Sequence, residues 1–526
     1  MKLQQFPFGT GARFNADKGC LPETRVEILD KISDWVNDLS PSSPKVMILF
    51  GKAGTGKSAI ANEIAKRFHS LQRLTASYRF VKGASPYQFC TTLARNLCSK
   101  YPSFKASLGR IISNDPDIVS AQDYTTLCKT LLLDPLKSLH FVSPVFIVVD
   151  ALDECEDTGR GLSASGGIPF HTFLKQHLFE FPDNFRILIT SRPVANIEKT
   201  FPESPLVRHL RIDHENLADG VRADILLYIR TTLHEENIEE GSLHKLVEKA
   251  EGLFQWAFVA CDYLSNPPPG LDAKGCLKQI LDINGALDLL DELYSTVLKA
   301  HFGKEESRTC FKIVMGQILA AFEPLSITSL NMLLHHTGSN VDVSNLVKHM
   351  GSLLSNVTPL NETLPIGLLH TSFRDFLTSK RSGEFHVSLD DPHCQLAHAT
   401  QKTMQAGLHF NMCRLETSYL LNSEVQDLQE RIEKYIPAAL SYSCRFWADH
   451  LALVPQKLIP QFDFDLFESL RVLLEENFLF WLEVLSVTQS LGPATAALSS
   501  SRTWISRLQD YVSVKITYFL LESHVE

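Results

Sequence analysis

Short apolar runs alternate with amphipathic stretches between about residue 45 and residue 212. The runs read KVMILF, SYRF, SPVFIVVD, FRILIT and VRHLRI, and each has the length of a single strand. Nearly continuous Val, Ile, Leu and Phe are typical of parallel strands that helices cover on both faces. The pattern therefore predicts an α/β domain with a parallel sheet over residues 45–212.

One amphipathic helix is predicted in front of this domain. In TRVEILDKISDWV, the residues Val26, Leu29, Ile32 and Val36 recur at helical spacing and fall on one face. The segment PSSP then interrupts the helix before the first strand. Residues 1–44 are therefore expected to form a strap and a helix.

After residue 212 strand patterns become rare and helical periodicity dominates. We expect a small helical domain over residues 213–285, in which HKLVEKAEGLFQWAFVACDYL is helical and NPPPG is a break. Residues 286–390 combine helices with short apolar runs, and residues 391–526 are predicted to be almost entirely helical. Within the last segment, Pro437 is expected to kink a helix.

The sequence GKAGTGKS, directly after the run VMILF, satisfies the pattern GxxxxGK(S/T) of a phosphate-binding loop. Glycines let backbone N–H groups turn inward around the phosphates, because no Cβ atom clashes. Lys57 is expected to bring a positive charge to the β- and γ-phosphates, and the Ser58 hydroxyl to bind magnesium. The following helix directs its positive dipole end at the same anion. The predicted nucleotide-binding residues are Gly51, Lys52, Ala53, Gly54, Thr55, Gly56, Lys57, Ser58 and Ala59.

A second chemical pattern, DALDEC, follows the apolar run VFIVV. The run would deliver Asp150 to the carboxyl edge of the sheet, where α/β proteins bind their ligands, and we expect this carboxylate to hold magnesium. Glu154 is the predicted base that orients and deprotonates the attacking water, with Asp153 in support. The alternative is that Asp153 and Glu154 are ordinary polar residues that cap the next helix.

The next predicted strand, FRILITSRP, ends in three polar residues, Thr190, Ser191 and Arg192. Polar side chains at this edge can sense the γ-phosphate, and a guanidinium there can stabilise its charge. A salt-bridged surface arginine is an equally good interpretation of Arg192 from the sequence.

Composition narrows the classes of function. The 526 residues are 44% hydrophobic and 21% charged, as in globular proteins, and the length predicts several domains. The formal charge of -10 argues against nucleic acid or an anionic membrane as the main partner. No apolar run reaches the roughly 18 residues that suggest a membrane span. The eleven cysteines contain no CxxC pair, and we interpret them as reduced thiols of a cytoplasmic protein.

With these motifs, the chain resembles the NACHT family of signal-transduction ATPases with numerous domains. The acidic motif DALDE carries most of the resemblance, because the magnesium aspartate, Asp150, is followed by a small residue and, after one more position, by two acidic residues. The segment SRP is similar to the sensor segment of the family. CLPETRVEILDKISDW, GLFQWAFVA and LLHTSFRDFL are similar to fungal NACHT proteins of the nephrocystin-3-like type. The resemblance extends from about residue 13 to residue 450.

The resemblance implies a nucleotide-binding domain, a small helical domain, a winged-helix domain over 286–390 and a further helical segment. It also implies a role for His370, because in related proteins a winged-helix histidine before a helix of this form contacts the β-phosphate of ADP and locks the resting state. Without the resemblance, His370 is better interpreted as a core histidine that shares a helical face with Phe373 and Leu377. Arg13 or the segment CLPETR is expected to line the base pocket.

Three classes of P-loop protein fit these motifs to different degrees. A small-molecule kinase needs an acceptor site, and no such constellation is visible in the long helical part. A ring motor needs arginine fingers, which accelerate hydrolysis by about 10³ to 10⁵. The sequence shows no firm finger, so hydrolysis is expected to be slow. The class that remains is a switch that binds ATP or ADP with magnesium, hydrolyses ATP slowly and self-associates in the ATP state.

A non-hydrolysing scaffold that bound nucleotide stabilises is the alternative from another class. The cluster of Asp150, Asp153 and Glu154 argues against it, because a scaffold needs no acid that activates water. The base, adenine or guanine, stays open. The resemblance implies fungal immune-like defence or cell-death signalling, with effector or sensor proteins as partners. The effector domain and repeats usual in the family are not visible, so the sequence is either a reduced core or a piece of a longer product.

Overall fold

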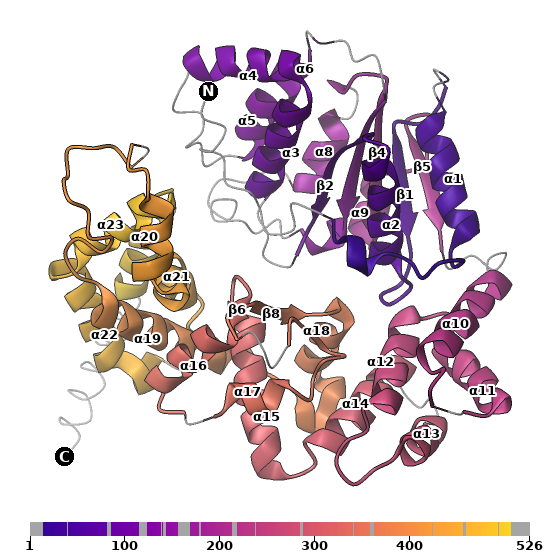
Figure 1. The fold of residues 1–526 in the computed structure, drawn as a ribbon. Helices are drawn as coiled ribbons and strands as arrows, with labels where there is room; N and C mark the ends of the chain where they lie inside the picture. The colour runs from indigo at the N-terminus through magenta and orange to yellow at the C-terminus, as the bar shows by residue number, and fades with distance from the viewer. Residues whose placement is uncertain are drawn as a thin grey trace, which may run out of the picture. The chain divides into compact units, whose positions relative to one another are not determined.

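The structure, a computed structural model, describes residues 14–38, 40, 42–81, 86–114, 124–137, 139, 144–155, 169–177, 180–212, 218–236, 238–283, 288–339, 341–357, 362–422, 424–455, 459–492 and 494–506. The chain forms two compact units, Met1–Leu290 and Asp291–Glu526. The first unit contains a parallel sheet, and the second is mostly helical (Figure 1).

The first unit is built around five parallel strands in the order β2-β3-β4-β1-β5 (Figure 1). The strands are β1 (Val46–Phe50), β2 (Leu74–Arg79), β3 (Val145–Asp150), β4 (Phe185–Ser191) and β5 (Val207–Arg211). They coincide with the five apolar runs, so the predicted α/β fold is confirmed. Because β4 lies between β1 and β3, the loops after these three strands open side by side at one edge of the sheet.

The three central strands β1, β3 and β4 are buried on both faces, as the runs without alternation predicted, whereas the outer strand β5 is partly exposed. Successive side chains of a strand point to opposite faces: Met47 and Leu49 of β1 pack in one cluster, and Val46, Ile48 and Phe50 pack in another. The helices of the first cluster are α1 (Val26–Asn37) and α2 (Lys57–Ser70). Those of the second are α3 (Pro86–Lys100), α4 (Pro102–Asn114), α5 (Tyr124–Cys128), η4 (Lys129–Leu133), α6 (Asp134–Leu136), α8 (Phe170–His177) and α9 (Ala195–Thr200).

The helix in front of the sheet is α1, and most of its predicted buried face is confirmed. Its buried residues are Ile28, Leu29, Ile32, Trp35 and Val36. The prediction was wrong for Val26, which is 49% exposed because it is the first residue of the helix and precedes the turns that pack on the sheet. Trp35 joins the buried face instead, and its indole N–H donates to the Pro44 carbonyl at 2.7 Å.

A cluster of helices follows the sheet, composed of α10 (Ala218–Thr232), α11 (Glu240–Ala250), α12 (Phe254–Ser265) and α13 (Ala273–Leu281). Helix α10 packs against α11 and α12, and α12 packs against α13. The helical stretch predicted from HKLVEKAEGLFQWAFVACDYL is interrupted, because Glu251 and Gly252 have φ angles of 45° and 81°. Such left-handed residues commonly end a helix, so α12 begins separately at Phe254.

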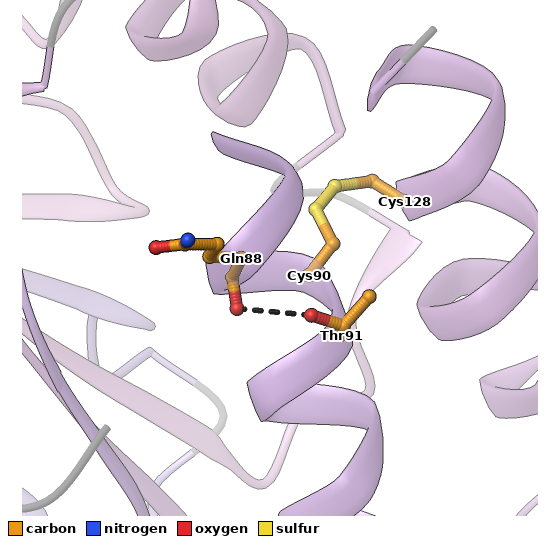
Figure 2. The surroundings of a disulfide bond; sticks show 4 residues. All are labelled: Gln88, Cys90, Thr91 and Cys128. Atoms are coloured by element: carbon orange, nitrogen blue, oxygen red, sulfur yellow. Dashed lines mark hydrogen bonds between the residues drawn. A yellow bond between two sulfur atoms is a disulfide. The ribbon is translucent and has the colours of Figure 1, made fainter. Parts of the chain in front are cut away.

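Cysteine pairing differs from the prediction of reduced thiols. Cys90 of α3 and Cys128 of α5 form a disulfide, with their Cα atoms 5.3 Å apart (Figure 2). The structure describes all eleven cysteines, and none of the other nine forms a disulfide. The two partners are separated by 38 positions and meet because α3 packs against α5. No local spacing signals such a pair, since its geometry depends on how the two helices meet.

The second unit contains a small antiparallel sheet in the order β6-β8-β7. Its strands are β6 (Leu325–Ser326), β7 (Leu354–Ser355) and β8 (Pro365–Leu368). The nearby helices are α14 (Leu289–His301), α15 (Glu305–Ala320), α16 (Ile327–His336), α17 (Val343–Val347), α18 (Thr371–Thr378) and η8 (Lys380–Phe385). A winged-helix domain uses elements of this kind, and that assignment stays a prediction.

The described remainder of the second unit is mostly helical, as predicted, apart from an irregular stretch between Gly407 and Leu428. Its helices are α19 (Asp390–Gly407), α20 (Leu428–Tyr435), α21 (Ala438–Ala452), α22 (Ile459–Glu475) and α23 (Phe478–Val487). Trp447, Trp481 and Trp504 lie in their shared core. Pro437 separates α20 from α21 completely instead of kinking one helix. Among the residues described, no helix has both the length and the apolar character needed to cross a bilayer.

Candidate nucleotide-binding site

The phosphate loop connects β1 to α2, and its backbone accounts for the glycines. Gly54 and Gly56 have φ angles of 83° and 91°, a region that glycine adopts without steric cost. A Cβ atom on Gly51 would lie 2.7 Å from the Thr55 hydroxyl oxygen, so this position has no room for a side chain. The tight winding suits a loop whose N–H groups surround a phosphate at a helix N-terminus.

Lys57 is the first residue of α2, and its side chain folds back along the loop. The ammonium group donates to the carbonyl oxygens of Gly51 at 2.7 Å and Lys52 at 2.8 Å. Burial lowers the pKa of Lys57, and the nearby carboxylates of Asp153 and Asp150 oppose that shift. The loop therefore holds a cation in place beside its own N–H groups.

Asp150, the last residue of β3, is the centre of a hydrogen-bonded group at the carboxyl edge of the sheet. Its Oδ1 accepts the Ser58 hydroxyl at 3.1 Å and the Thr190 hydroxyl at 2.5 Å. The Thr190 oxygen in turn accepts the backbone N–H of Ala151 at 2.9 Å. Ser58 and Asp150, both predicted as magnesium ligands, thus lie together, and Thr190 positions the carboxylate.

This donor set fits magnesium. Mg²⁺ prefers oxygen ligands, and it usually binds one or two protein groups together with phosphates and several waters. The Ser58 hydroxyl and the Asp150 carboxylate are two such groups at hydrogen-bond distance. Within the described ranges, no cluster of three or more His, Cys, Asp or Glu side chains offers a metal site made by protein alone.

Asp153 and Arg192, which the sequence assigned to separate tasks, bind each other. Asp153 Oδ1 accepts the Arg192 backbone N–H at 3.0 Å, and its Oδ2 accepts the side-chain Nε at 2.6 Å. The Asp153 side chain is only 4% exposed, against 31% for Arg192. Both carboxylate oxygens of Asp153 are used in this way, so its place favours positioning Arg192 over acting on water. The catalytic and sensor assignments of the two residues stay predictions.

Glu154 ends the short helix η5 (Leu152–Glu154), which begins after the left-handed residue Ala151. Burial raises the pKa of the Glu154 carboxyl to about 7, and the positive charge of Arg79 opposes the shift. A carboxyl group that titrates near neutral pH is well matched to the role of a proton acceptor. The property suits the predicted base, while the role itself stays a prediction.

Arg79 belongs to the site, although the sequence analysis did not select it. It is the last residue of β2, lies opposite Asp150 in the parallel register, and has its Nε 3.6 Å from Asp150 Oδ2. The run SYRF carried a signal, because a charged residue interrupts an apolar strand. The run does not show which residue of a distant strand this arginine will face.

The loop is also held through its carbonyl groups. The Arg25 guanidinium donates to the Thr55 carbonyl at 2.7 Å, and the Gln255 backbone N–H donates to the Gly54 carbonyl at 3.0 Å. Arg25 lies over the Phe254 ring at 4.7 Å and is 5% exposed. These contacts join the loop to the segment before α1 and to the start of α12.

Helix α10 fixes the same arginine from another direction. The Arg25 backbone N–H donates to Asp224 Oδ2 at 3.0 Å, and Nε lies 4.0 Å from the same oxygen. We call Arg25, Asp224, Phe254 and Gln255 the carbonyl clamp. The segment CLPETR was predicted to line the base pocket, whereas Arg25 within it binds the phosphate loop. Arg13 lies outside the described residues.

The other predicted site residues are placed as follows. Lys52 is exposed, and Ala53 and Ala59 are half-buried. His370 is in the second unit, where it caps α18: its Nδ1 accepts the Ser372 backbone N–H at 3.1 Å. It is half-buried, unlike the core histidine of the alternative interpretation. The contact between His370 and ADP stays a prediction.

Comparison with known proteins shows which family this part of the chain resembles. Residues 24–192 match the family model described as nephrocystin 3, N-terminal. One of the solved structures that match is titled "Structure of Drosophila ORC bound to DNA". The sequence identity is 14%, and the match covers 66% of this chain and 91% of that chain. The TM-score of 0.27 is too low to support a conclusion. No curated protein matches the sequence. Residues 24–192, which include the phosphate loop and Asp150, are therefore similar to the N-terminal, NACHT-like domain of nephrocystin 3.

Proposed function

We propose that this chain is a nucleotide-dependent switch that binds ATP or ADP with magnesium, hydrolyses ATP slowly and self-associates in the ATP state. The observation that carries the proposal is the grouping of Ser58, Asp150 and Glu154. A hydroxyl and a carboxylate suited to magnesium lie in the same site as a buried carboxyl with a pKa of about 7. A scaffold that only stores nucleotide needs the first pair but has no use for the third group.

In the proposed reaction, a water oxygen attacks the γ-phosphorus and passes its proton to the ionised Glu154 carboxylate. The bond from the γ-phosphorus to the β–γ bridging oxygen breaks, and ADP and phosphate leave. Bound magnesium would neutralise charge on the phosphate oxygens. Lys57 binds the β- and γ-phosphate oxygens, Ser58 and Asp150 hold the metal, and Asp153 orients Arg192.

The carbonyl clamp supports a switch because it connects the loop to helices outside the sheet. The carbonyls of Gly54 and Thr55 share their peptide groups with the N–H groups of the following residues. A peptide whose N–H binds an anion is more polarised, and its carbonyl becomes a stronger acceptor. Phosphate binding is therefore expected to strengthen the hydrogen bonds from Arg25 and Gln255. Because Gln255 belongs to α12, the effect of binding would be transmitted to this helix.

The change of state itself is part of the proposal. We propose that His370 closes over ADP in the resting form and that the γ-phosphate favours an open form. Shifting such an equilibrium from 1:99 to 99:1 takes about 5.5 kcal/mol, which about two to four charge-assisted hydrogen bonds can supply. The signalling context that we propose is fungal immune-like defence or cell death, with effector or sensor proteins as partners. GTP in place of ATP is the alternative ligand.

The first test identifies nucleotide in the freshly purified protein by denaturation and chromatography. About one ADP per chain supports the resting switch, and GDP would assign the base to guanine. If the protein carries none, titration with ATP and GTP analogues in the presence of magnesium follows. Absence of binding in that titration would overturn the proposal.

A second test separates the switch from the scaffold. Glu154→Gln is expected to slow hydrolysis by about 10² to 10⁴, to retain ATP and to raise the oligomeric fraction in size-exclusion chromatography with light scattering. Glu198→Gln is the matched control, because Glu198 pairs with Arg211 at the far strand of the sheet. Hydrolysis at the unmodified rate in Glu154→Gln would show that another group is the base. Binding without any hydrolysis in the unmodified chain would support the scaffold.

A further inference from the structure

We propose that Arg79 contacts the terminal phosphoryl group of a bound nucleoside triphosphate and thereby distinguishes triphosphate from diphosphate. The inference rests on the proposed function and names the residue through which the same site would sense its nucleotide. It goes beyond the motifs of the sequence, in which Arg192 was the candidate sensor. Three observations support it: position, hydrogen bonding and charge.

The position of Arg79 follows from the sheet. Parallel strands end at the same edge, and Arg79 and Asp150 are paired as the last residues of β2 and β3. Asp150 in turn accepts the hydroxyl of Ser58, the residue of the phosphate loop that is expected to bind the metal of the terminal phosphates. Arg79 is thus one strand away from Asp150, the carboxylate proposed to hold the metal.

The hydrogen bonding of Arg79 is incomplete. Its Nε is buried, has no hydrogen-bond partner among the described residues, and lies 3.6 Å from Asp150 Oδ2, too far for a good hydrogen bond. A buried donor without an acceptor costs free energy. About a third of the side chain remains exposed, so a ligand can reach it. A phosphoryl oxygen is a strong acceptor that matches the donor fork of a guanidinium.

A second positive charge lies near Arg79. Lys18, in the short helix η2 (Ala16–Lys18), lies near it: partial burial and then repulsion by Arg79 lower the pKa of Lys18. The acidic groups that face Arg79 are Asp150 and Glu154. The proposed reaction assigns Asp150 to the metal and Glu154 to the water proton. The terminal phosphate is then the anion that remains for Arg79 and Lys18 to bind.

Two other arginines at the same edge of the sheet make the contrast clear. Arg192 donates to Asp153 through both its backbone N–H and its Nε. Arg211, the last residue of β5, pairs with Glu198 at 2.6 Å. Strands β2 and β5 are the two outer strands of the sheet (Figure 1). Each of them ends in an arginine. Arg192 and Arg211 have a carboxylate at hydrogen-bond distance, whereas Arg79 does not.

The test compares Arg79→Met with Arg211→Met, which removes an arginine from the other outer strand. Affinities for a non-hydrolysable triphosphate analogue and for the diphosphate are measured by calorimetry with magnesium, in the adenine and guanine series. We expect Arg79→Met to lose about tenfold or more in triphosphate affinity, as for one hydrogen bond to a charged group. Its diphosphate affinity is expected to stay within about twofold. Arg79→Lys is expected to recover part of the loss, and Arg211→Met to change neither affinity.

Each outcome decides between interpretations. Equal losses for triphosphate and diphosphate in Arg79→Met would mean that Arg79 only supports the fold around Asp150, and unchanged affinities would overturn the inference while the switch stands. If the unmodified chain binds neither nucleotide, the proposed function fails as well. Should Arg79→Met not fold, as judged by circular dichroism, the ratio of the two affinities in Arg79→Lys decides: an unchanged ratio overturns the inference.

Discussion

On its N–H side, the phosphate loop faces Lys57, Ser58 and Asp150; on its carbonyl side, it is bonded to Arg25 and Gln255. The first set is expected to bind a phosphate and its metal in place of its present contacts within the site, whereas the second set holds the loop to segments outside it. One loop therefore serves two purposes. Its N–H groups are expected to recognise the phosphate, and its carbonyl groups attach the loop to neighbouring segments. Changes on the N–H side should therefore appear mainly in ligand binding, and changes on the carbonyl side should also appear in the ligand-free protein.

The largest effect is expected for Lys57→Ala on the N–H side. Loss of about two charge-assisted hydrogen bonds to phosphate lowers nucleotide affinity by about 100-fold or more, measured by calorimetry. The control is Lys52→Ala, because Lys52 is exposed and adjacent in the same loop; its loss is expected to be much smaller. Equal losses in the two variants would show that only the overall charge of the loop matters.

The pH dependence of hydrolysis and of stability provides a further test of the N–H side. Because the pKa of Glu154 is about 7, its ionised fraction rises about tenfold between pH 6 and pH 8, and kcat/KM is expected to rise with it. The unfolded chain titrates nearer 4.5, so the folded protein holds more protons between these values. The free energy of unfolding should therefore decrease as pH rises from about 4.5 to 7.

Both trends are expected to disappear in Glu154→Gln, which cannot titrate. Hydrolysis rates and chemical denaturation at matched pH values provide the two measurements. A flat rate profile in the unmodified protein would contradict the assignment of Glu154 as the base.

On the carbonyl side, Arg25→Ala removes the guanidinium that donates to the Thr55 carbonyl and lies beside the Asp224 carboxylate, while the backbone N–H of residue 25 can still donate to Asp224. We expect the ligand-free protein to lose about 2 kcal/mol and nucleotide affinity to fall about tenfold, with Arg25→Lys in between. Differential scanning fluorimetry and calorimetry measure the two effects. Arg230→Ala on α10 is the control, because Arg230 forms an exposed pair with Glu240. A loss of affinity with no change in melting temperature would contradict the division between the two sides.

The smallest effect is expected at Gly54, which takes part in both sides. An alanine there would keep a φ of about 83° and bring its Cβ to 3.0 Å from the Cβ of Gln255. The left-handed conformation costs about 1 to 2 kcal/mol, so melting temperature and affinity should both decrease modestly. Gly220→Ala is the control, because a Cβ there meets nothing within 4 Å and alanine favours a helix. A larger loss for Gly220→Ala would contradict this explanation.

The sequence predicts the N–H side of the phosphate loop better than the carbonyl side. Lys57, Ser58 and Asp150 could be predicted as site residues because each lies in a short motif beside an apolar strand, and such local patterns determine the strands themselves. Arg25 and Thr55 are 30 positions apart, and Arg25 and Asp224 are 199 apart. Contacts of that kind depend on how strands and helices pack, and a single sequence shows no period that reports them.

The features that the sequence did not predict have the same explanation, because they depend on contacts between distant segments. Arg79 gains its place from the register between β2 and β3, and the disulfide of Cys90 with Cys128 depends on how α3 packs against α5. By contrast, the break before α12 was visible in Gly252, a residue that ends helices. A periodicity argument passed over it because the apolar spacing continues on both sides.

The carbonyl clamp limits how this chain can be cut and rejoined. A fragment with only residues 45–212 would keep the phosphate loop, the DALDEC segment and the SRP segment, yet its phosphate loop would lose both Arg25 and Gln255. Gene fusions with junctions at residue 45 or 212 would separate the loop from its attachments, whereas junctions before residue 14 and after α13 would not. The smallest portable nucleotide-binding module is therefore expected to span residues 14–281, and grafting that length should preserve binding where the shorter piece does not.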